Sequence, residues 1–151
     1  MLKKITDFFE KHLLLPEEDD GQNKDHSLRL ATAALLIEMT RADYEVKAVE
    51  QEQLISVLQQ RFSISADETI ELMSLAELEA DQATSYHEFT SLMNQHYSQQ
   101  DKVRVIEMLW EVAYADGEIE KYEDFLVRKI ADLLYISHND FIEAKHRVVD
   151  R

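Results

Sequence analysis

Acidic side chains concentrate in the stretch YADGEIEKYE, residues 114–123, which lies between two apolar segments. With an acid shortly before the stretch, they are Glu111, Asp116, Glu118, Glu120 and Glu123. Carboxylate oxygens are the ligands that divalent cations such as calcium, magnesium and manganese prefer in proteins. The pattern therefore predicts a divalent-cation site. The alternative is that these acids stabilise the start of a helix through its dipole, by roughly 0.3–1 kcal/mol each, while Gly117 ends the preceding helix.

An EF-hand calcium loop is excluded by the ligands that this stretch lacks. Asp116, Gly117 and Glu123 fit the second half of such a loop. The first half needs side-chain oxygens at its first and third positions. Val112 and Tyr114 occupy them here and continue the apolar helical pattern. Any cation site must therefore be built differently.

The same arrangement of acids occurs twice in the chain. The segment LLIEMTRADYEVKAVE, residues 35–50, aligns with MLWEVAYADGEIEKYE, residues 108–123, and after one gap FSIS at 62–65 aligns with LYIS at 134–137. Four acids keep their spacing in both copies: Glu38, Asp43, Glu45 and Glu50 in the first, and Glu111, Asp116, Glu118 and Glu123 in the second. This duplication predicts two helix–turn–helix repeats that pack about a pseudo-twofold axis.

Glu38 and Glu111 are the most informative of these acids because each lies among apolar neighbours on a helix expected to be buried. A buried carboxylate is costly unless it is paired, hydrogen-bonded or bound to a cation. Ion pairs with Arg41, Arg104 or Lys102 would satisfy them, as would a helix rotated toward solvent. The choice between a cation and an internal partner therefore stays open.

The composition favours helices. The chain of 151 residues contains only two glycines and one proline, and 45% of it is apolar. An all-β fold needs many more turn residues, so an all-α domain with a substantial core is expected. The absence of cysteine excludes disulfides and thiolate metal sites and predicts a reducing, cytoplasmic location.

The charge restricts the class of partner. Against 31 acidic residues there are 16 basic ones, a net charge of −15. Phosphate binding needs clustered lysine and arginine, so DNA and RNA are not expected as partners. Cations or a basic protein surface suit this charge better. No apolar run approaches the roughly 18 residues of a membrane-spanning helix, and stable membrane association is not expected.

The elements that must position the acids follow from hydrophobic spacing. Residues 1–20 are expected to form an amphipathic helix and an acidic loop, and residues 21–151 a helical domain. The apolar stripe of residues 1–15 favours packing on the domain's own core over an interfacial membrane helix. Further helices are expected at 25–42, 47–61, around 66–80 and 85–98, from Asp101 or a neighbour to 113, and at 122–135 and 138–149. Ser65 with Glu68 and Ser137 with Asp140 are predicted to cap two of them.

Other reactive patterns are incomplete, so the chain is predicted not to be an enzyme. A di-iron bundle needs two Glu-x-x-His pairs, and only Glu143 and His146 fit. HEFTS at residues 87–91 lacks the second histidine of a zinc-protease helix. There is no glycine-rich phosphate loop and no serine in a nucleophile context. Catalysis by a pair of carboxylates is the remaining, less favoured reading.

The duplicated Ala-Asp turns on apolar helices resemble the tellurite-resistance TerB family, over roughly residues 25–150. The resemblance implies a single compact all-α domain of about seven to eight helices with internal pseudo-symmetry. It also implies acidic clusters that bind divalent metal, and a non-enzymatic role in stress response or protein docking. In the second copy Glu111, Asp116, Glu118 and Glu123 match the family motif best. The same domain type is found in a membrane-anchored DnaJ-type co-chaperone, but no HPD motif occurs here, so co-chaperone activity is not implied.

The first copy matches the family motif less well. Glu38, Asp43, Glu45 and Glu50 occupy the corresponding positions. Tyr44 stands where the family usually has glycine, and a tyrosine at positive φ is strained. The first turn is therefore expected to be reshaped, with a weaker capacity for metal.

Overall fold

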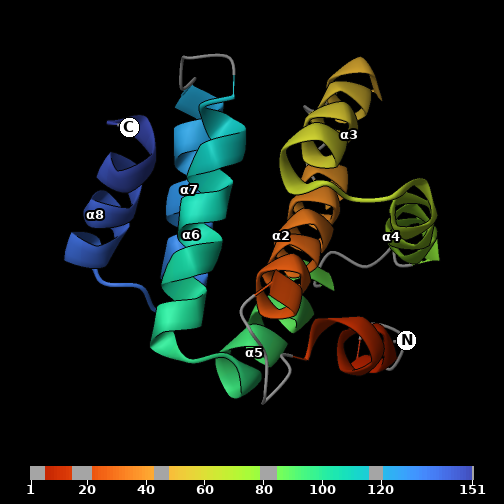
Figure 1. Ribbon diagram of the computed structural model, residues 1–151, viewed down its shortest axis with the longest axis horizontal. Coiled ribbons are helices and arrows are strands. Elements are labelled where there is room, and N and C mark those ends of the chain that lie inside the picture. Colours follow the sequence, from red (N-terminus) through yellow and green to blue (C-terminus); the bar gives the residue numbers. More distant parts are fainter. Residues whose placement is uncertain (1–5, 15–21, 43–47, 79–84, 116–120, 151) are drawn as a thin grey trace. The chain divides into compact units, whose positions relative to one another are not determined.

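The computed structural model describes residues 6–14, 22–42, 48–78, 85–115 and 121–150. These residues form helices and no strand (Figure 1). The helices are η1 (Phe9–Leu13), α2 (Gln22–Ala42), α3 (Ala48–Phe62), α4 (Ala66–Leu78), α5 (Ser85–His96), α6 (Gln99–Ala113), α7 (Lys121–Leu133) and α8 (His138–Val149). The all-α prediction is confirmed.

Helix boundaries largely follow the predicted capping signals. The Ser65 hydroxyl accepts the Glu68 backbone N–H at 3.1 Å, and the Glu68 carboxylate accepts the Ser65 N–H at 2.9 Å. The Ser137 hydroxyl accepts the Asp140 N–H at 3.1 Å. The predicted capping box at Ser65 is confirmed, and Ser137 is confirmed as an N-cap through the bond of its hydroxyl. Each serine hydroxyl accepts an N–H group that has no partner inside the helix.

Two predicted boundaries around α5 and α6 were wrong. Helix α5 ends at His96 rather than residue 98, and α6 begins at Gln99 rather than near Asp101. Ser98 is the N-cap of α6, and it forms a reciprocal capping box with Asp101. Asp101 is therefore the third residue of the helix instead of its start. An acid at this position has the same sequence signal as an acid at the cap itself.

The chain divides into two compact units, residues 1–92 and 93–151, which are described separately. In unit 1, helix α2 is the central element and contacts η1, α3 and α4 (Figure 1). Its residues from Leu30 to Glu38 are all buried. The expectation that this helix is buried is thus confirmed, because α2 has neighbours on several sides. The predicted domain boundary after residue 20 stays a prediction.

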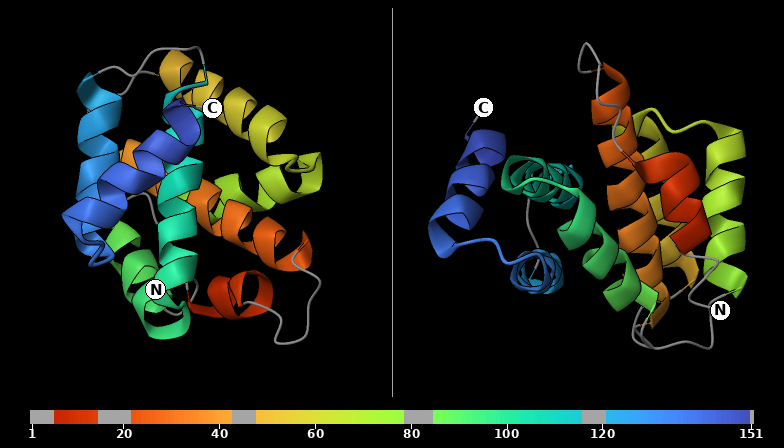
Figure 2. Two further views of the ribbon diagram at one scale, coloured as in Figure 1. Left: turned by 60° about the vertical axis from the view of Figure 1, so that its left-hand side comes forward. Right: turned by 90° about the horizontal axis from the view of Figure 1, so that it is seen from below.

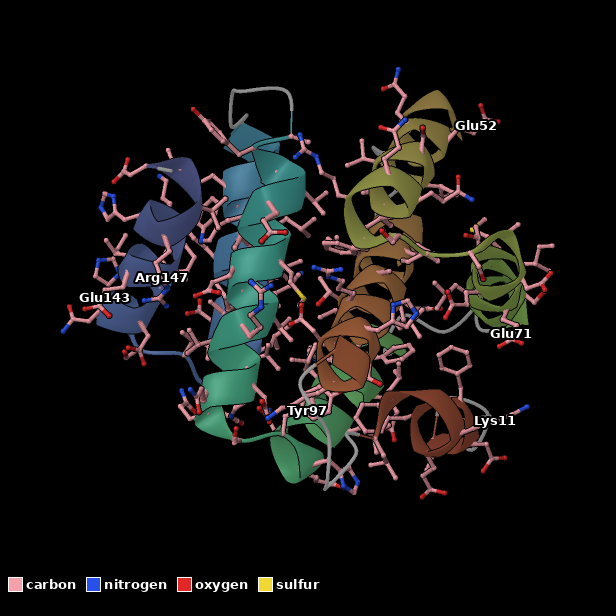
Figure 3. All side chains as sticks on the ribbon, viewed as in Figure 1. Lys11, Glu52, Glu71, Tyr97, Glu143 and Arg147 are labelled. Atoms are coloured by element: carbon pink, nitrogen blue, oxygen red, sulfur yellow. The ribbon has the colours of Figure 1, made fainter. Side chains whose placement is uncertain are left out.

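The N-terminal helix η1 belongs to unit 1. Phe9 and Leu13 are fully buried, and η1 packs against α2. Thr6, just before it, donates a hydrogen bond to the Glu88 carboxylate at 3.4 Å. The exposed Lys11 side chain points away from the helices of unit 1 (Figure 3). The stripe therefore covers the core of unit 1, as expected. Among the described helices, none is long and apolar enough to cross a membrane.

In unit 2, helix α6 is central and contacts α7 and α8. The right-hand view of Figure 2 shows α6 and α7 nearly end-on, with α8 beside them. Trp110 of α6 is fully buried, and its ring centroid lies 5.3 Å from that of Phe141 on α8. The Lys145 ammonium lies 5.2 Å from the Trp110 ring, and the Arg128 guanidinium 5.0 Å from the Phe141 ring. Aromatic contacts flanked by cations thus join the three helices.

The two copies of the repeat share local backbone geometry. Ser63 and Tyr135 occupy aligned positions, and both have positive φ, 54° and 57°. In both copies a buried isoleucine and a capping serine follow. In both, a central helix contacts the next two helices of its unit. The pseudo-symmetric helix–turn–helix repeats and their twofold axis stay predictions.

Candidate cation-binding connections

The structure describes some of the predicted site residues fully, some only in their backbone, and others not at all. Glu38 lies on α2 and Glu111 on α6. Glu50 and Glu123 lie on the backbones of α3 and α7, but their side chains are outside the described part of the chain. The candidate site acids that lie outside the described residues are Asp43, Glu45, Asp116, Glu118 and Glu120. Tyr44, expected to be strained, is also outside them.

Helices that contact each other flank both acidic segments. Helix α2 ends at Ala42 and α3 begins at Ala48, and these two helices pack together. In the second copy the described chain ends at Ala115 and resumes at Lys121, the start of α7, which packs on α6. Residues 43–47 and 116–120 are therefore aligned connections between packed helices.

Helix α6 closes before its acidic connection begins. The Tyr114 N–H donates to the Trp110 carbonyl at 2.9 Å, and the Ala115 N–H donates to the Val112 carbonyl at 3.2 Å. This is a tightened last turn that satisfies carbonyls at the helix end. The prediction that the helix continues through the positions that an EF-hand needs for ligands is confirmed. Val112 lies within α6, and Tyr114 is its C-cap.

Glu111 has an internal partner. Its Oε1 lies 3.5 Å from Arg104 Nη1, and the Glu111 side chain is 17% exposed. The same guanidinium nitrogen lies 3.1 Å from Oε1 of Glu107, which also pairs with Arg147 of α8. Of the alternatives stated for Glu111, the structure shows the ion pair with Arg104. Two carboxylates and two guanidiniums thus form a mutually neutralising group between α6 and α8.

Lys102, the other suggested partner in unit 2, has a different contact. Its side chain is buried, and its ammonium donates to Oδ1 of Asn94 at 3.1 Å. Burial lowers the pKa of Lys102 because it disfavours the charged form. Nearby in sequence, burial first and Asp101 second raise the pKa of Tyr97 (labelled in Figure 3). Both groups belong to the packed interior of unit 2.

Glu38 is the least exposed of the unit 1 acids whose side chains the structure describes. Its relative exposure is 3%, on the central helix α2. It takes part in an interaction within the protein. The prediction that Glu38 is buried is confirmed. Arg41, suggested as its partner, has a side chain outside the described residues.

Two interactions were missed by sequence reasoning. The Nε2 atom of His26 on α2 lies 2.8 Å from Oε2 of Glu68 on α4. Glu107 joins α6 to Arg147, forty positions later on α8. The spacing of Arg104 and Glu107 was a usable signal for a helical ion pair. The contacts between separate helices had no such signal, because they depend on how the helices pack.

Histidines give no metal centre in the described residues. His146 pairs through Nδ1 with Asp150 at 2.8 Å, and Glu143 (Figure 3) is exposed on the same helix. No group of three or more histidine, aspartate or glutamate side chains in the described ranges is placed to hold a metal ion. Any such site therefore has to include acids outside the described ranges, among them those of the two acidic connections.

The family comparison covers both units. The model of the family described as tellurite resistance protein TerB matches residues 29–146, close to the range of the resemblance noted from the motifs. Neither the curated proteins nor the solved structures give a match. The matched span includes α6, α7, both acidic connections and most of α2 and α8. The chain belongs to the TerB family.

Proposed function

We propose that this chain is a non-enzymatic, acidic binding module that takes a divalent cation at the connection between α6 and α7, and more weakly at the connection between α2 and α3. The observation that carries the proposal is the repeated position of the acids. Both aligned connections lie between helices that pack together, and both contain an Asp and a Glu at the same spacing. Because packed helices hold both ends of each connection, less conformational entropy is lost when a cation orders the connection.

The ligand chemistry supports a hard cation. The residues at 116–120 include three carboxylates, and there is no cysteine in the chain. Oxygen ligands without thiolates favour calcium, magnesium or manganese over softer metals. A binding role fits a family that is not generally catalytic. The proposed setting is cytoplasmic, with a protein partner and without nucleic acid.

Titration calorimetry with calcium, magnesium, manganese and zinc tests the proposal. We expect binding heat for at least one of the first three and a rise in melting temperature at millimolar ion. Asp116→Asn with Glu118→Gln removes most of the heat, and Asp43→Asn with Glu45→Gln removes less. The matched control, Glu10→Gln with Glu143→Gln, makes the same charge change at two exposed positions. No heat and no thermal shift in the wild-type chain would refute the proposal.

A second candidate is a docking domain in which the acids serve structure only. The observation that favours it is the ion pair between Glu111 and Arg104, which neutralises this carboxylate without a metal. The Arg104→Gln variant separates the two candidates. Under the cation proposal it removes a competing positive charge and tightens ion binding. Under the docking candidate it destabilises unit 2 and leaves the ion titration without heat.

A further inference from the structure

Tyr135, immediately after α7, is the most exposed large apolar side chain that the structure describes, at 76%. Its φ of 57° places it in the left-handed region, which is unfavourable for a residue with a large side chain. Within the described part of the chain, its ring makes no hydrogen bond or ring contact. The fold therefore gains no visible stabilisation from a tyrosine ring at this position.

The first copy of the repeat shows that the turn does not require tyrosine. Ser63 occupies the aligned position with nearly the same φ, 54°. It too is followed by a buried isoleucine and a capping serine. A small polar residue therefore supports the same local backbone. The turn conformation therefore does not require the aromatic ring of Tyr135.

The turn that presents Tyr135 is held firmly. The Asn94 side chain donates to the Leu133 carbonyl at 3.0 Å, and the Gln99 side chain donates to the Tyr135 carbonyl at 3.4 Å. The Tyr135 N–H donates to the Asp132 carbonyl at 3.1 Å. Strained backbone persists where surrounding contacts fix it. An exposed aromatic on such a turn loses little conformational freedom when it binds.

The electrostatics at this end of α7 favour a cation. Asp132 is exposed in the last turn, where the helix dipole favours a base, and no ion pair of Asp132 is found among the described residues. The negative end of a helix, a carboxylate and the face of an aromatic ring each attract positive charge. The nearby Lys102 ammonium is buried and directed at Asn94. The outer side of the turn thus remains available to a cation from solution.

We propose that Tyr135 and Asp132 form a recognition site for a lysine or arginine side chain on a basic protein segment. The net charge of −15 steers such a segment toward the chain and opposes a second copy as the occupant. This inference rests on the binding function proposed above and specifies its protein partner as one with a basic segment. It uses none of the residues of the acidic connections, so either proposal can fail alone.

The test is an NMR titration of the full chain with a tetra-arginine peptide, with a tetra-glutamine peptide as the neutral reference. We expect the arginine peptide to shift the Tyr135 ring signals and the Asp132 amide. An exposed cation–π contact corresponds to about a two- to five-fold change in affinity. Tyr135→Ser and Asp132→Asn should each weaken binding by about that factor. Tyr135→Phe keeps the ring and should bind like the wild type.

Two controls make the result decisive. Tyr135→Ser copies the residue at the aligned position 63, so its melting temperature should not fall. Asp67→Asn removes an exposed acid from α4 and should leave the affinity almost unchanged. Equal weakening by Asp67→Asn and Asp132→Asn would mean that only net charge matters, and it would overturn the proposal. Unchanged affinity in Tyr135→Ser, or equal binding of the glutamine peptide, would also overturn it.

Discussion

Replacing Phe141 by alanine tests the account of unit 2 most severely. Phe141 is 3% exposed and packs against Trp110 at 5.3 Å between ring centroids. Truncating a buried phenylalanine to alanine costs about 3–5 kcal/mol, through lost burial and the cavity left behind. The aromatic contact accounts for about 0.5–1.5 kcal/mol of this. We therefore expect the free energy of unfolding of unit 2 to fall by about 4 kcal/mol.

The assay follows from the composition. The chain has one tryptophan, and it is the buried Trp110 of unit 2, so its fluorescence reports on this unit during urea unfolding. With a slope of about 2 kcal/mol per molar, the midpoint falls by about 2 M. Phe141→Leu, with about 1 kcal/mol of loss, keeps the test valid if the alanine variant does not fold. Phe125→Ala on α7 is the matched control, because Phe125 is 60% exposed. Equal midpoint shifts in Phe141→Ala and Phe125→Ala would refute the reasoning.

Two further predictions concern carboxylates that join helices. Glu107→Gln removes the negative charge that Arg104 and Arg147 share and replaces one of its two acceptor oxygens by an NH2 donor. It should therefore lower the stability of unit 2 by about 1–2 kcal/mol, measured by the same urea titration. For Glu68, burial would raise the pKa, but the Ser65 N–H and the His26 ring outweigh burial and lower the pKa below its ordinary 4.5. The stabilisation from Glu68 is therefore present above about pH 4.5 and is lost as the pH falls through the lowered folded-state pKa. The stability gap between the wild type and Glu68→Gln should shrink in acid, as followed by circular dichroism from pH 7 to pH 2.

Each of these predictions has its own control. Asp150→Asn removes an exposed acid that pairs with His146 on α8. It should cost less than about 0.5 kcal/mol. A loss as large as that of Glu107→Gln would mean that the position between α6 and α8 has no special role. A stability gap for Glu68→Gln that stays constant down to pH 2 would contradict the pKa argument.

The fold was predictable because composition and local signals agree. The small number of glycines, the helical spacing of apolar residues and the serine caps at 65 and 137 all indicate helices, and the structure confirms these helices. The start of α6 was misplaced because Asp101 has the sequence signal of a cap while Ser98 performs that role. Local sequence signals thus indicated which helices form, but the start of α6 depended on which of two nearby polar residues, Ser98 or Asp101, caps it.

The candidate site was predictable only where it depends on neighbours in sequence. The pairing of Glu111 with Arg104, seven positions earlier on the same helix, was among the stated alternatives. The contacts of Glu107 with Arg147 and of Glu68 with His26 join separate helices. Their formation depends on packing distances and helix rotation, which no pattern of acids encodes. The duplicated spacing predicted which acids share a position, but not which of them find an internal base.

The binding of manganese, followed by NMR, tests the central claim most directly. Paramagnetic manganese broadens the signals of nuclei close to it, so it reports where the ion binds as well as whether it binds. The account predicts that substoichiometric manganese broadens the amides of residues 116–120 first and those of 43–47 next, while Glu10 and Glu143 stay sharp. Excess magnesium should reverse the broadening. Broadening spread evenly over all exposed acids, or none in the two connections, would contradict the claim.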